Sequence, residues 1–528
     1  MKPTRRDFLA TTAATLAATA APMVASGMFQ TSKSAATAKL NIRVDAKADR
    51  ISRHIYGHFA EHLGRCVYDG IWVGPDSSIP NINGFRKDVV AALKAMKIPN
   101  LRWPGGCFAD QYQWRDGIGP RKDRPRTVNI HWGNYVEDNS FGTHEFMDLC
   151  ELLECDAYVA FNVGSGTPAQ MAAWIEYMTF DGDSTLARER KKNGREQPWK
   201  LPFAGIGNEN WGCGGNMTPE FYADQMNQFL VYARNFGKNR MTKIGCGPNV
   251  EDYNWAEVLL KKQRGIQGLS WHYYTHYPNW REKGAALADD VASWHGTLER
   301  AVHTEEILTK ADAIFDQVDP QNKIGLYFDE WGTWHRTEQG DTALYQQNTI
   351  RDALVASASL DCFHGHRKRI RMTNIAQVLN VLQSVILTEV SGGKDRMLLT
   401  PTYHVFEMNK VHHDAIGVPI DIESPDYTVG EKTIKQLSAS ASVAEDGTLN
   451  VSLSNLHHEN AIEIDAELKG ANASRIVGRL LTAAALNAHN TFDAPETVKP
   501  VEFTEAKIAG GKLKLTLPAR SFAVMSIS

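Results

Sequence analysis

Two periodicities of hydrophobic and polar residues alternate along most of the chain after about residue 50. Short apolar runs are each followed by a longer stretch in which apolar residues recur at helical spacing. This order is typical of β-α units that build a parallel sheet. The predicted strands are 55–59, 100–103, 157–163, 203–207, 243–246, 269–273, 325–329 and 370–373. The predicted helices between them include 85–96, 144–153, 168–178, 220–236, 298–317 and 342–360. Because a closed barrel requires eight such strands, residues 50–390 predict an α/β fold, a (β/α)₈ TIM barrel.

The pattern changes after about residue 390, where strict alternation replaces the helical spacing. Residues 438–443 and 449–455 alternate on either side of Glu445-Asp446-Gly447, a turn sequence typical of a hairpin. The same alternation recurs in 461–468, 501–508 and 512–517. Residues 391–528 therefore predict a second domain, an all-β antiparallel sandwich. Residues 38–48 also alternate, and we expect them to add an N-terminal strand to that sandwich.

The first residues resemble an export signal. Arg5 and Arg6 precede an Ala/Thr-rich stretch, and small residues around Ala25 and Ser26 offer a cleavage site. The pattern is similar to a bacterial twin-arginine signal; the alternative is an ordinary secretory signal with an incidental arginine pair. We expect residues 1–27 to be removed and the protein to be periplasmic or secreted. No later apolar run reaches the roughly 20 residues of a membrane span, so no membrane anchor is expected after cleavage.

Composition and charge exclude several classes of function. The 528 residues carry a formal net charge of −4, which does not favour nucleic acid as a partner. The sequence has no glycine-rich phosphate loop, so no cofactor is expected. His272 and His276 have i, i+4 spacing but lie in a strand-to-loop segment, so we expect no metal site. The seven cysteines lack a framework spacing, and we expect most of them to be free thiols.

Two apolar runs end abruptly in a glutamate, Glu209 in Gly207–Trp211 and Glu330 in Tyr327–Gly332. They are about three β-α units apart in a barrel of roughly 250 residues plus insertions. Parallel strands bring their carboxyl ends to one end of a barrel, so the two carboxylates are expected to meet there. Such a pair is the apparatus of a retaining glycoside hydrolase, in which one carboxyl protonates the leaving oxygen and the other attacks the anomeric carbon. We predict that Glu209 is the acid/base and Glu330 the nucleophile.

The neighbours of the two glutamates fit these roles. The residues around Glu209 are mostly uncharged, so desolvation and a second carboxylate would raise its pKa. Glu330 needs a cation and a hydrogen-bond donor close by, and Arg102 and Tyr274, near the ends of other predicted strands, are the candidates. Asp329 alternates to the other face of its strand and is expected to be structural.

Two further residues are candidates for binding the sugar. Asn208 points to the opposite side of the extended chain from Glu209, where it could bond the sugar 2-hydroxyl. Glu61 ends the first predicted strand at the same barrel mouth and could bind sugar hydroxyls; the alternative is that it caps a helix.

Eight segments, taken in order, resemble the α-L-arabinofuranosidases of glycoside hydrolase family fifty-one, a family of clan A retaining glycosidases. The segments are GHFAEHLG at 57–64, LRWPGGCF at 101–108, FGTHEF at 141–146, NVGSGT at 162–167, GNENWG at 207–212, DEWG at 329–332, NIAQVLNVL at 374–382 and LTPTYHVF at 399–406. Each one is moderately specific, but the ordered set covers everything except the leader, so the resemblance is strong.

The resemblance implies a (β/α)₈ barrel with a C-terminal β-sandwich, and retaining cleavage of terminal arabinofuranosyl groups from arabinoxylan, arabinan and their oligosaccharides. Glu209 would be the acid/base and Glu330 the nucleophile. The sugar would be held by Glu61, Cys107, Asn208, Tyr274 and Gln377, with Arg102 and His272 supporting the carboxylates. Family members often carry Asn where this chain has Cys107, and cysteine is a poor hydrogen-bond partner. Many relatives form oligomers, so a homo-oligomer is expected.

The leading hypothesis is therefore a retaining, exo-acting α-L-arabinofuranosidase that acts on arabinofuranosyl-containing oligo- or polysaccharides. One alternative is a β-xylosidase or endo-β-glucanase on the same scaffold. An endo-acting enzyme is expected to have an open cleft, whereas an exo-acting one is expected to have a closed pocket. Another alternative, a carbohydrate-binding protein that has lost catalysis, conflicts with the intact Glu209 and Glu330.

Overall fold

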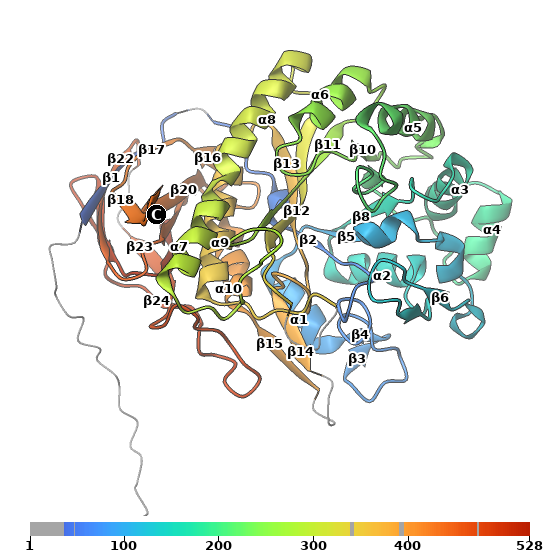
Figure 1. Ribbon diagram of the computed structural model, residues 1–528, viewed down its shortest axis with the longest axis horizontal. Coiled ribbons are helices and arrows are strands. Elements are labelled where there is room, and N and C mark those ends of the chain that lie inside the picture. The colour runs from blue at the N-terminus through green and yellow to red at the C-terminus, as the bar shows by residue number, and fades with distance from the viewer. Residues whose placement is uncertain (1–35, 47, 338–342, 390–394, 472–474) are drawn as a thin grey trace, which may run out of the picture. The chain divides into compact units, whose positions relative to one another are not determined.

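The computed structural model describes residues 36–46, 48–337, 343–389, 395–471 and 475–528. The predicted leader, 1–27, lies outside these described residues. Residues Ala36–Ser528 form a unit that contains a barrel and a β-sandwich (Figure 1). Among the described residues, no helix is both long enough and apolar enough to cross a membrane.

Eight parallel strands close into the barrel in the order in which they follow one another along the chain. They are β2 (Gly57–Phe59), β5 (Asn100–Trp103), β8 (Asp156–Phe161), β9 (Phe203–Ile206), β10 (Thr242–Gly245), β11 (Gly268–Thr275), β12 (Gly325–Thr333) and β13 (Ile370–Ile375). The predicted TIM barrel is confirmed, and each predicted strand overlaps one of these. Strands β11 and β12 are longer than predicted, so Tyr274 and Glu330 lie within paired strands rather than in the loops that follow.

The helices surround and extend the barrel. They are α1 (Lys87–Met96), α2 (Thr143–Leu153), α3 (Pro168–Thr179), α4 (Thr185–Lys192), α5 (Pro219–Tyr232), α6 (Tyr253–Lys262), α7 (Val291–Val302), α8 (Thr304–Val318), α9 (Ile350–Gly365) and α10 (Pro401–Asn409). Three of them start at a Thr-Pro pair, where Thr167, Thr218 or Thr400 accepts a backbone N–H of the first turn. Proline suits the first helical position because its missing N–H has no partner there anyway.

The barrel interior is layered. Its apolar layer is a buried cluster contributed by five strands, made of Tyr158, Phe203, Ile244, Tyr327 and Met372. A polar layer follows towards the carboxyl ends of the strands, and the Tyr158 hydroxyl joins the two by donating to Asp329 Oδ2 at 2.7 Å. The polar residues at the carboxyl end of the barrel therefore rest on a packed apolar layer in the barrel interior.

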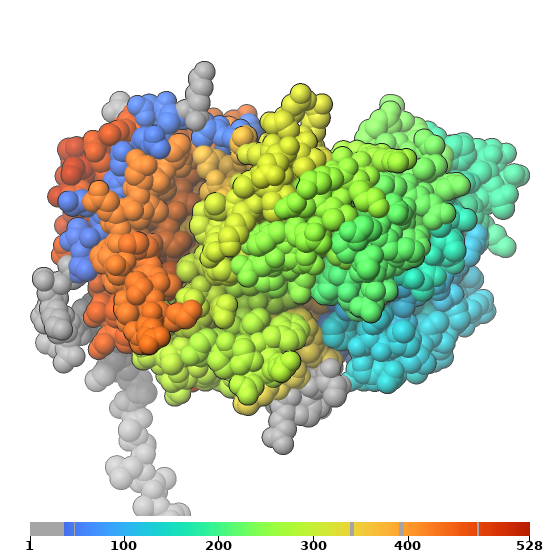
Figure 2. Space-filling view, turned by 45° about the horizontal axis from the view of Figure 1, so that its top comes forward, coloured from blue at the N-terminus to red at the C-terminus, as the bar shows by residue number. Residues whose placement is uncertain are grey.

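Two sheets form the C-terminal sandwich, and their apolar faces share one core. The first sheet has the order β17 (Ile420–Glu423), β1 (Ala36–Arg43), β22 (Ile462–Lys469), β26 (Lys512–Leu517) and β25 (Lys507–Ala509). The second has the order β16 (Ile416–Val418), β20 (Leu437–Val443), β21 (Leu449–Asn455), β27 (Ser521–Ile527), β23 (Ile476–Thr482) and β24 (Val501–Glu502). The predicted sandwich is confirmed. Among the described strands of the sandwich, only β1 and β22 pair in parallel. Figure 2 shows the first described residues, in blue, among the orange and red of the C-terminal strands.

Four two-stranded sheets complete the described strands: β3 (Asn81–Ile82) with β4 (Phe85–Arg86), β6 (Thr127–Val128) with β7 (Val136–Glu137), β14 (Ile386–Glu389) with β15 (Arg396–Leu399), and β18 (Asp426–Val429) with β19 (Lys432–Lys435).

Serine residues line the contact between the barrel and the sandwich. Ser454 on β21 donates to Ser357 on α9 at 2.8 Å, and Ser440 on β20 lies 2.9 Å from Nδ1 of His364 on α9. These serines alternate along their strands with core residues such as Leu453. One face of the sheet therefore packs in the sandwich core and the other binds the barrel helix through hydroxyl groups.

Candidate active site

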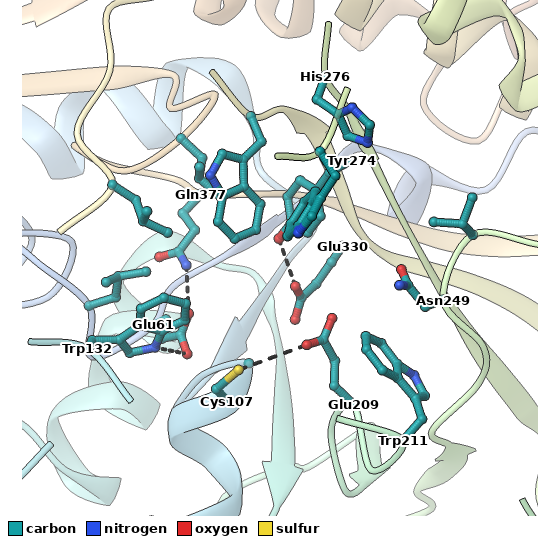
Figure 3. Close-up of a pocket in the computed structure, with 17 residues that line it drawn as sticks. Glu61, Cys107, Trp132, Glu209, Trp211, Asn249, Tyr274, His276, Glu330 and Gln377 are labelled. Carbon is teal, nitrogen blue, oxygen red and sulfur yellow. Dashed lines mark hydrogen bonds between the residues drawn. The ribbon is translucent and has the colours of Figure 1, made fainter. Parts of the chain in front are cut away.

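Side chains from six barrel strands meet at the carboxyl end of the barrel, beside a cavity of about 430 Å³. Strand by strand, they are Glu61 after β2, Arg102 on β5, Asn208 and Glu209 after β9, His272 and Tyr274 on β11, Glu330 on β12 and Gln377 after β13. Figure 3 shows Glu209 and Glu330 turned towards each other in the middle of the cavity. Glu61 and Gln377 lie to one side of them, and Trp211 lies to the other.

Glu209 sits in a tight turn that its surroundings hold in place. Its backbone φ is +42°, a left-handed conformation that costs a non-glycine residue roughly 1–3 kcal/mol. The buried Asp110 accepts the backbone N–H of Asn208 at 2.8 Å, and the carbonyl of Glu209 accepts the N–H of Gly214 at 3.0 Å. No side chain fits at Gly214, because its Cβ would lie 1.9 Å from the carbonyl oxygen of Asn208. The backbone on both sides of Glu209 is therefore fixed by contacts with other residues.

Glu330 is held by one donor on each carboxylate oxygen. Arg102 Nη1 donates to Oε1 at 2.8 Å, and the Tyr274 hydroxyl donates to Oε2 at 2.7 Å. Arg102 also donates from Nη2 to Asn208 Oδ1 at 2.6 Å, so one guanidinium links the two glutamate segments. A Cβ at Gly106 would lie only 2.9 Å from Glu330 Oε1, so a glycine is needed to leave this oxygen accessible.

His272 lies between the two glutamates as a buried cation. Its Nδ1 is 2.8 Å from Glu209 Oε1, and its Nε2 is 3.1 Å from Asp329 Oδ1. Burial alone would lower the pKa of His272, but the charge of Glu330 and the bonds to Asp329 and Glu209 raise it to about 10. Both ring nitrogens therefore donate hydrogen bonds at neutral pH. Burial also raises the pKa of Glu209 above its ordinary value, with a further contribution from the charge of Glu330 and against the opposing effect of His272.

Glu61 anchors one end of the cavity. Its Oε1 accepts the Trp132 indole N–H at 3.0 Å and the backbone N–H of Phe108 at 3.1 Å, and its Oε2 accepts Gln377 Nε2 at 2.8 Å. Burial and the charge of Glu330 raise the pKa of Glu61 to about 7. Figure 3 shows Trp132 and Gln377 each bonded to Glu61, so these three side chains form a wall at this end of the cavity.

Cys107, which lines the cavity, forms a disulfide with Cys213. The Sγ atoms of Cys107 and Cys213 lie 3.9 and 3.5 Å from Glu209 Oε2. The expectation that most of the cysteines are free thiols is confirmed by Cys66, Cys150, Cys155, Cys246 and Cys362, but the sequence did not indicate this disulfide. The reason is tertiary: the two cysteines follow different barrel strands, and only closure of the barrel brings them together. As a disulfide, Cys107 has no S–H to offer a sugar and instead contacts the acid/base candidate.

The structure brings the predicted site residues together at this end of the barrel. Six of them line the cavity: Glu61, Cys107, Glu209, Tyr274, Glu330 and Gln377. The other three, Arg102, Asn208 and His272, lie buried behind them.

Two important neighbours were not identified from the sequence. Asp110, whose pKa burial raises to about 7, follows the conspicuous Pro-Gly-Gly motif by only a few residues. Trp132 lies in a connection without regular periodicity, so no sequence pattern pointed to it. Asp329 contacts His272 rather than the cavity, in line with a structural role.

Comparison with known protein families identifies the chain. Residues 92–289 match the family described as "Alpha-L-arabinofuranosidase 1 domain", and residues 329–521 match "Alpha-L-arabinofuranosidase C-terminal domain". The chain is also 48% identical over 497 residues to the "Intracellular exo-alpha-L-arabinofuranosidase" of Bacteroides ovatus, covering 93% of this chain and 96% of that one. The chain belongs to the α-L-arabinofuranosidases of glycoside hydrolase family fifty-one. It is therefore a glycoside hydrolase.

Solved structures of this arabinofuranosidase family have the same fold. The family member from Xanthomonas axonopodis pv. citri superposes with a TM-score of 0.91 at 44% identity, covering 93% of this chain and 100% of the other. The arabinose complex of the Thermotoga maritima α-L-arabinofuranosidase superposes with a TM-score of 0.82 at 30% identity, covering 93% and 99%. The resemblance inferred from eight short segments is thus confirmed over most of the chain.

The predicted periplasmic or secreted location is wrong, as the comparison with the Bacteroides ovatus relative shows. The Bacteroides ovatus relative matches almost the whole chain and is named as an intracellular enzyme. An arginine pair before an Ala/Thr-rich stretch is a short, compositional signal that other N-terminal sequences share, so it carries less weight than this full-length match.

Proposed function

We propose that the protein is a retaining, exo-acting α-L-arabinofuranosidase that releases terminal arabinofuranosyl groups from hemicellulose or arabinan oligosaccharides. The observation that carries this proposal is that one oxygen of Glu209 and one of Glu330 lie within 4.8 Å of each other. Retaining glycosidases hold their two carboxyl groups about 5–5.5 Å apart, whereas inverting enzymes need roughly 6.5–9.5 Å to admit a water molecule. The short separation supports double displacement.

In the first step, a carboxylate oxygen of Glu330 attacks the anomeric carbon of the bound arabinofuranosyl group. The glycosidic C–O bond breaks, and Glu209 gives its proton to the leaving oxygen. The raised pKa of Glu209 favours the protonated acid that this step needs. Arg102 and Tyr274 hold the attacking carboxylate in a single orientation, so little reorganisation is required.

In the second step, Glu209 is a carboxylate and accepts a proton from water. That water attacks the anomeric carbon, the ester bond to Glu330 breaks, and arabinose leaves with its anomeric configuration retained. His272 is already protonated and donates to Glu209 Oε1, so it stabilises the negative charge that Glu209 carries between the two steps.

Two buried polar atoms support sugar binding beside the glutamates. Asn208 Nδ2 and Gln377 Oε1 have no hydrogen-bond partner among the described residues. Buried polar groups are nearly always hydrogen-bonded, so hydroxyl groups of the sugar are suitable partners for both atoms. The interlocked wall of Glu61, Trp132 and Gln377 closes one end of the cavity, which favours binding a chain end rather than the middle of a polymer.

The opposite end of the cavity suits the rest of the substrate. Trp211, which is partly exposed, lies there, across the two glutamates from Glu61 and Gln377 (Figure 3). Aromatic rings at a rim stack on the apolar faces of sugars, so this end is where the leaving group would lie. An arabinofuranosyl-containing oligo- or polysaccharide is therefore the proposed substrate.

We also propose that the protein is a homo-oligomer. Helix α5 exposes Phe221, Val231 and Tyr232, with exposed fractions of 52%, 54% and 51%. Several large apolar side chains on one surface helix favour protein contact over solvent. Light scattering after size-exclusion chromatography should give a mass above the 58.8 kDa of one chain, and a mass of one chain would contradict this part of the proposal.

Hydrolysis of an aryl α-L-arabinofuranoside and an aryl β-D-xyloside, measured side by side, tests the proposed function. We expect a strong preference for the arabinofuranoside, whereas dominant xyloside cleavage would indicate a β-xylosidase with the same two catalytic glutamates.

Azide should rescue Glu209→Ala on the arabinofuranoside, because azide replaces water in the second step without needing a general base. A variant that azide does not rescue would contradict the assignment of Glu209.

A further inference from the structure

The Cys107–Cys213 disulfide has a position that the proposed reaction does not use. Both sulfurs face the same carboxylate oxygen, Glu209 Oε2, at 3.9 and 3.5 Å. All three residues are only partly buried, and Cys107 and Glu209 line the cavity. A small solute that enters the cavity can therefore reach the disulfide and the acid/base at the same point.

Two sulfurs and a carboxylate oxygen are a ligand set for a thiophilic divalent cation. In a tetrahedral zinc site, bond lengths of about 2.3 Å to sulfur and about 2.0 Å to oxygen give S···O edges of roughly 3.5 Å. The two sulfur–oxygen distances here are already close to that length. One ligand atom from each of Cys107, Glu209 and Cys213 also lies within 4.8 Å of the other two. Only the distance between the two sulfurs has to increase, to the roughly 3.8 Å that separates two sulfur ligands of a tetrahedral zinc ion. Breaking the S–S bond permits this.

We propose that reduction of the Cys107–Cys213 disulfide by a dithiol creates a binding site for a thiophilic divalent cation such as Zn²⁺ or Cd²⁺, with both sulfurs and Glu209 as ligands, and that the bound cation stops catalysis. The dithiol supplies two electrons and two protons and becomes a disulfide itself, while Cys107 and Cys213 become thiols. The cation then displaces the two thiol protons to the buffer. Water from the cavity completes the fourth position.

Inhibition follows from the role of Glu209. A carboxylate bound to a divalent cation can neither carry the proton for the leaving oxygen nor accept one from water. The inference rests on the proposed function in this one respect, because it takes Glu209 as the acid/base. The hydrogen bond from His272 to the other oxygen, Oε1, leaves Oε2 free to bind the cation and fixes the plane of the carboxylate.

The remaining cysteines offer a matched control. Cys155 is partly buried like Cys107, but it precedes β8 and therefore lies at the amino end of the barrel, opposite the site. Cys155→Ser removes a thiol without touching the proposed ligands. Cys213→Ser removes one ligand, and Glu209→Gln removes another while leaving the disulfide in place.

Cadmium binding tests the site without any measurement of hydrolysis. The purified protein, with or without reduction by a dithiol that is then removed, is titrated with Cd²⁺ while the ultraviolet charge-transfer absorption of cadmium–thiolate bonds is recorded. We expect the band to saturate at one equivalent in the reduced protein and in reduced Cys155→Ser, and to be absent in the oxidised protein. Reduced Cys213→Ser and Glu209→Gln should bind at least tenfold more weakly. The same band in reduced Cys213→Ser, or none in the reduced wild type, would overturn the proposal.

Zinc inhibition tests the consequence for catalysis. One equivalent of Zn²⁺ should lower turnover of the reduced enzyme at least tenfold, a chelator should restore it, and the oxidised enzyme should lose less than twofold. Equal inhibition of the two forms would overturn the proposal. Near-ultraviolet circular dichroism of each reduced sample shows whether it remains folded, and Glu209→Gln keeps the test valid if a serine variant does not fold. If the wild type hydrolyses no arabinofuranoside, the proposed function fails, and the cadmium titration still decides whether the site exists.

Discussion

Two buried histidines in different regions of the molecule differ in charge, because His272 is positively charged and His412 is neutral. At the barrel mouth, His272 lies between the carboxylates of Glu209 and Asp329, and its pKa rises to about 10. At the contact between barrel and sandwich, His412 lies between the hydroxyls of Ser442 and Ser452, at 2.7 and 2.6 Å. Burial, with a smaller effect of His413, lowers the pKa of His412 to about 3.

The difference shows that neighbours, rather than burial, decide the protonation state. Desolvation favours the neutral ring in both regions, but only carboxylates return enough electrostatic energy to charge it. A hydroxyl group can donate to a neutral imidazole or accept from it, so a serine-lined surface needs no ion. Charged groups therefore gather at the carboxyl end of the barrel, where the reaction takes place. The contact between the two domains is instead stabilised by hydrogen bonds between neutral groups.

The largest effect is expected for the nucleophile at the charged region. Glu330→Gln keeps the volume and partners of the side chain but removes the attacking oxygen, so kcat/KM for an aryl α-L-arabinofuranoside should fall on the order of 10⁴-fold or more. Steady-state kinetics measures this, with thermal unfolding as the control for folding. Turnover within tenfold of the wild type would contradict the assignment of Glu330.

Replacing the charged histidine should affect catalysis next most strongly. His272→Asn removes a cation that donates to Glu209 and Asp329, and loss of one preorganised donor typically costs about 10²–10³-fold in turnover. The measurement is kcat on the same aryl glycoside. An unchanged kcat would show that the charge at this position does not contribute to the reaction.

The sequence indicated the carboxyl-end chemistry well because its signals are local. Glu209 and Glu330 each end an apolar run. The sequence contains eight short apolar runs in all, and these were enough to infer the barrel that brings the two glutamates together. Barrel closure also explains why Arg102 could be assigned to a glutamate far away in the chain.

The parts that were missed depend on contacts that no local pattern carries. Cys107 and Cys213 have ordinary spacing in the sequence, and only the barrel places their sulfurs side by side. Ser440 and Ser452 alternate with apolar residues, as they would if their face of the sheet were exposed to solvent. Both are nevertheless buried. Periodicity thus predicts which residues share a face of a sheet, but not what covers that face.

The neutral region should respond in stability rather than in catalysis. His364 bonds the Tyr56 hydroxyl at 2.6 Å and the Ser440 hydroxyl at 2.9 Å. The shorter side chain in His364→Asn leaves both buried hydroxyls without their partner, which should lower the free energy of unfolding by about 3 kcal/mol. Urea denaturation measures the change. The kcat should stay within twofold of the wild type, and a large loss of kcat at normal stability would contradict the division between the two regions.

Acid should weaken the neutral region through the same histidines. Because the pKa of His412 is about 3 in the folded protein and about 6.5 in the unfolded chain, the unfolded chain binds more protons between these values. The contribution of His412 to stability is therefore complete above pH 6.5 and declines as the pH falls towards 3, reaching a loss of about 2 kcal/mol at pH 5. His364, whose ring centroid lies 5.2 Å from that of His412, and the adjacent His413 also have lowered pKa values and act in the same direction.

His412→Gln isolates this last and smallest effect. Glutamine can hydrogen-bond with Ser442 and Ser452 but does not titrate, so the loss of unfolding free energy between pH 7 and pH 5 should be about 2 kcal/mol smaller than in the wild type. Urea denaturation at the two pH values gives the difference directly, and comparing each protein with itself cancels any packing defect of the variant. An equal pH dependence in both proteins would mean that His412 is already charged when folded, and the contrast with His272 would then fail.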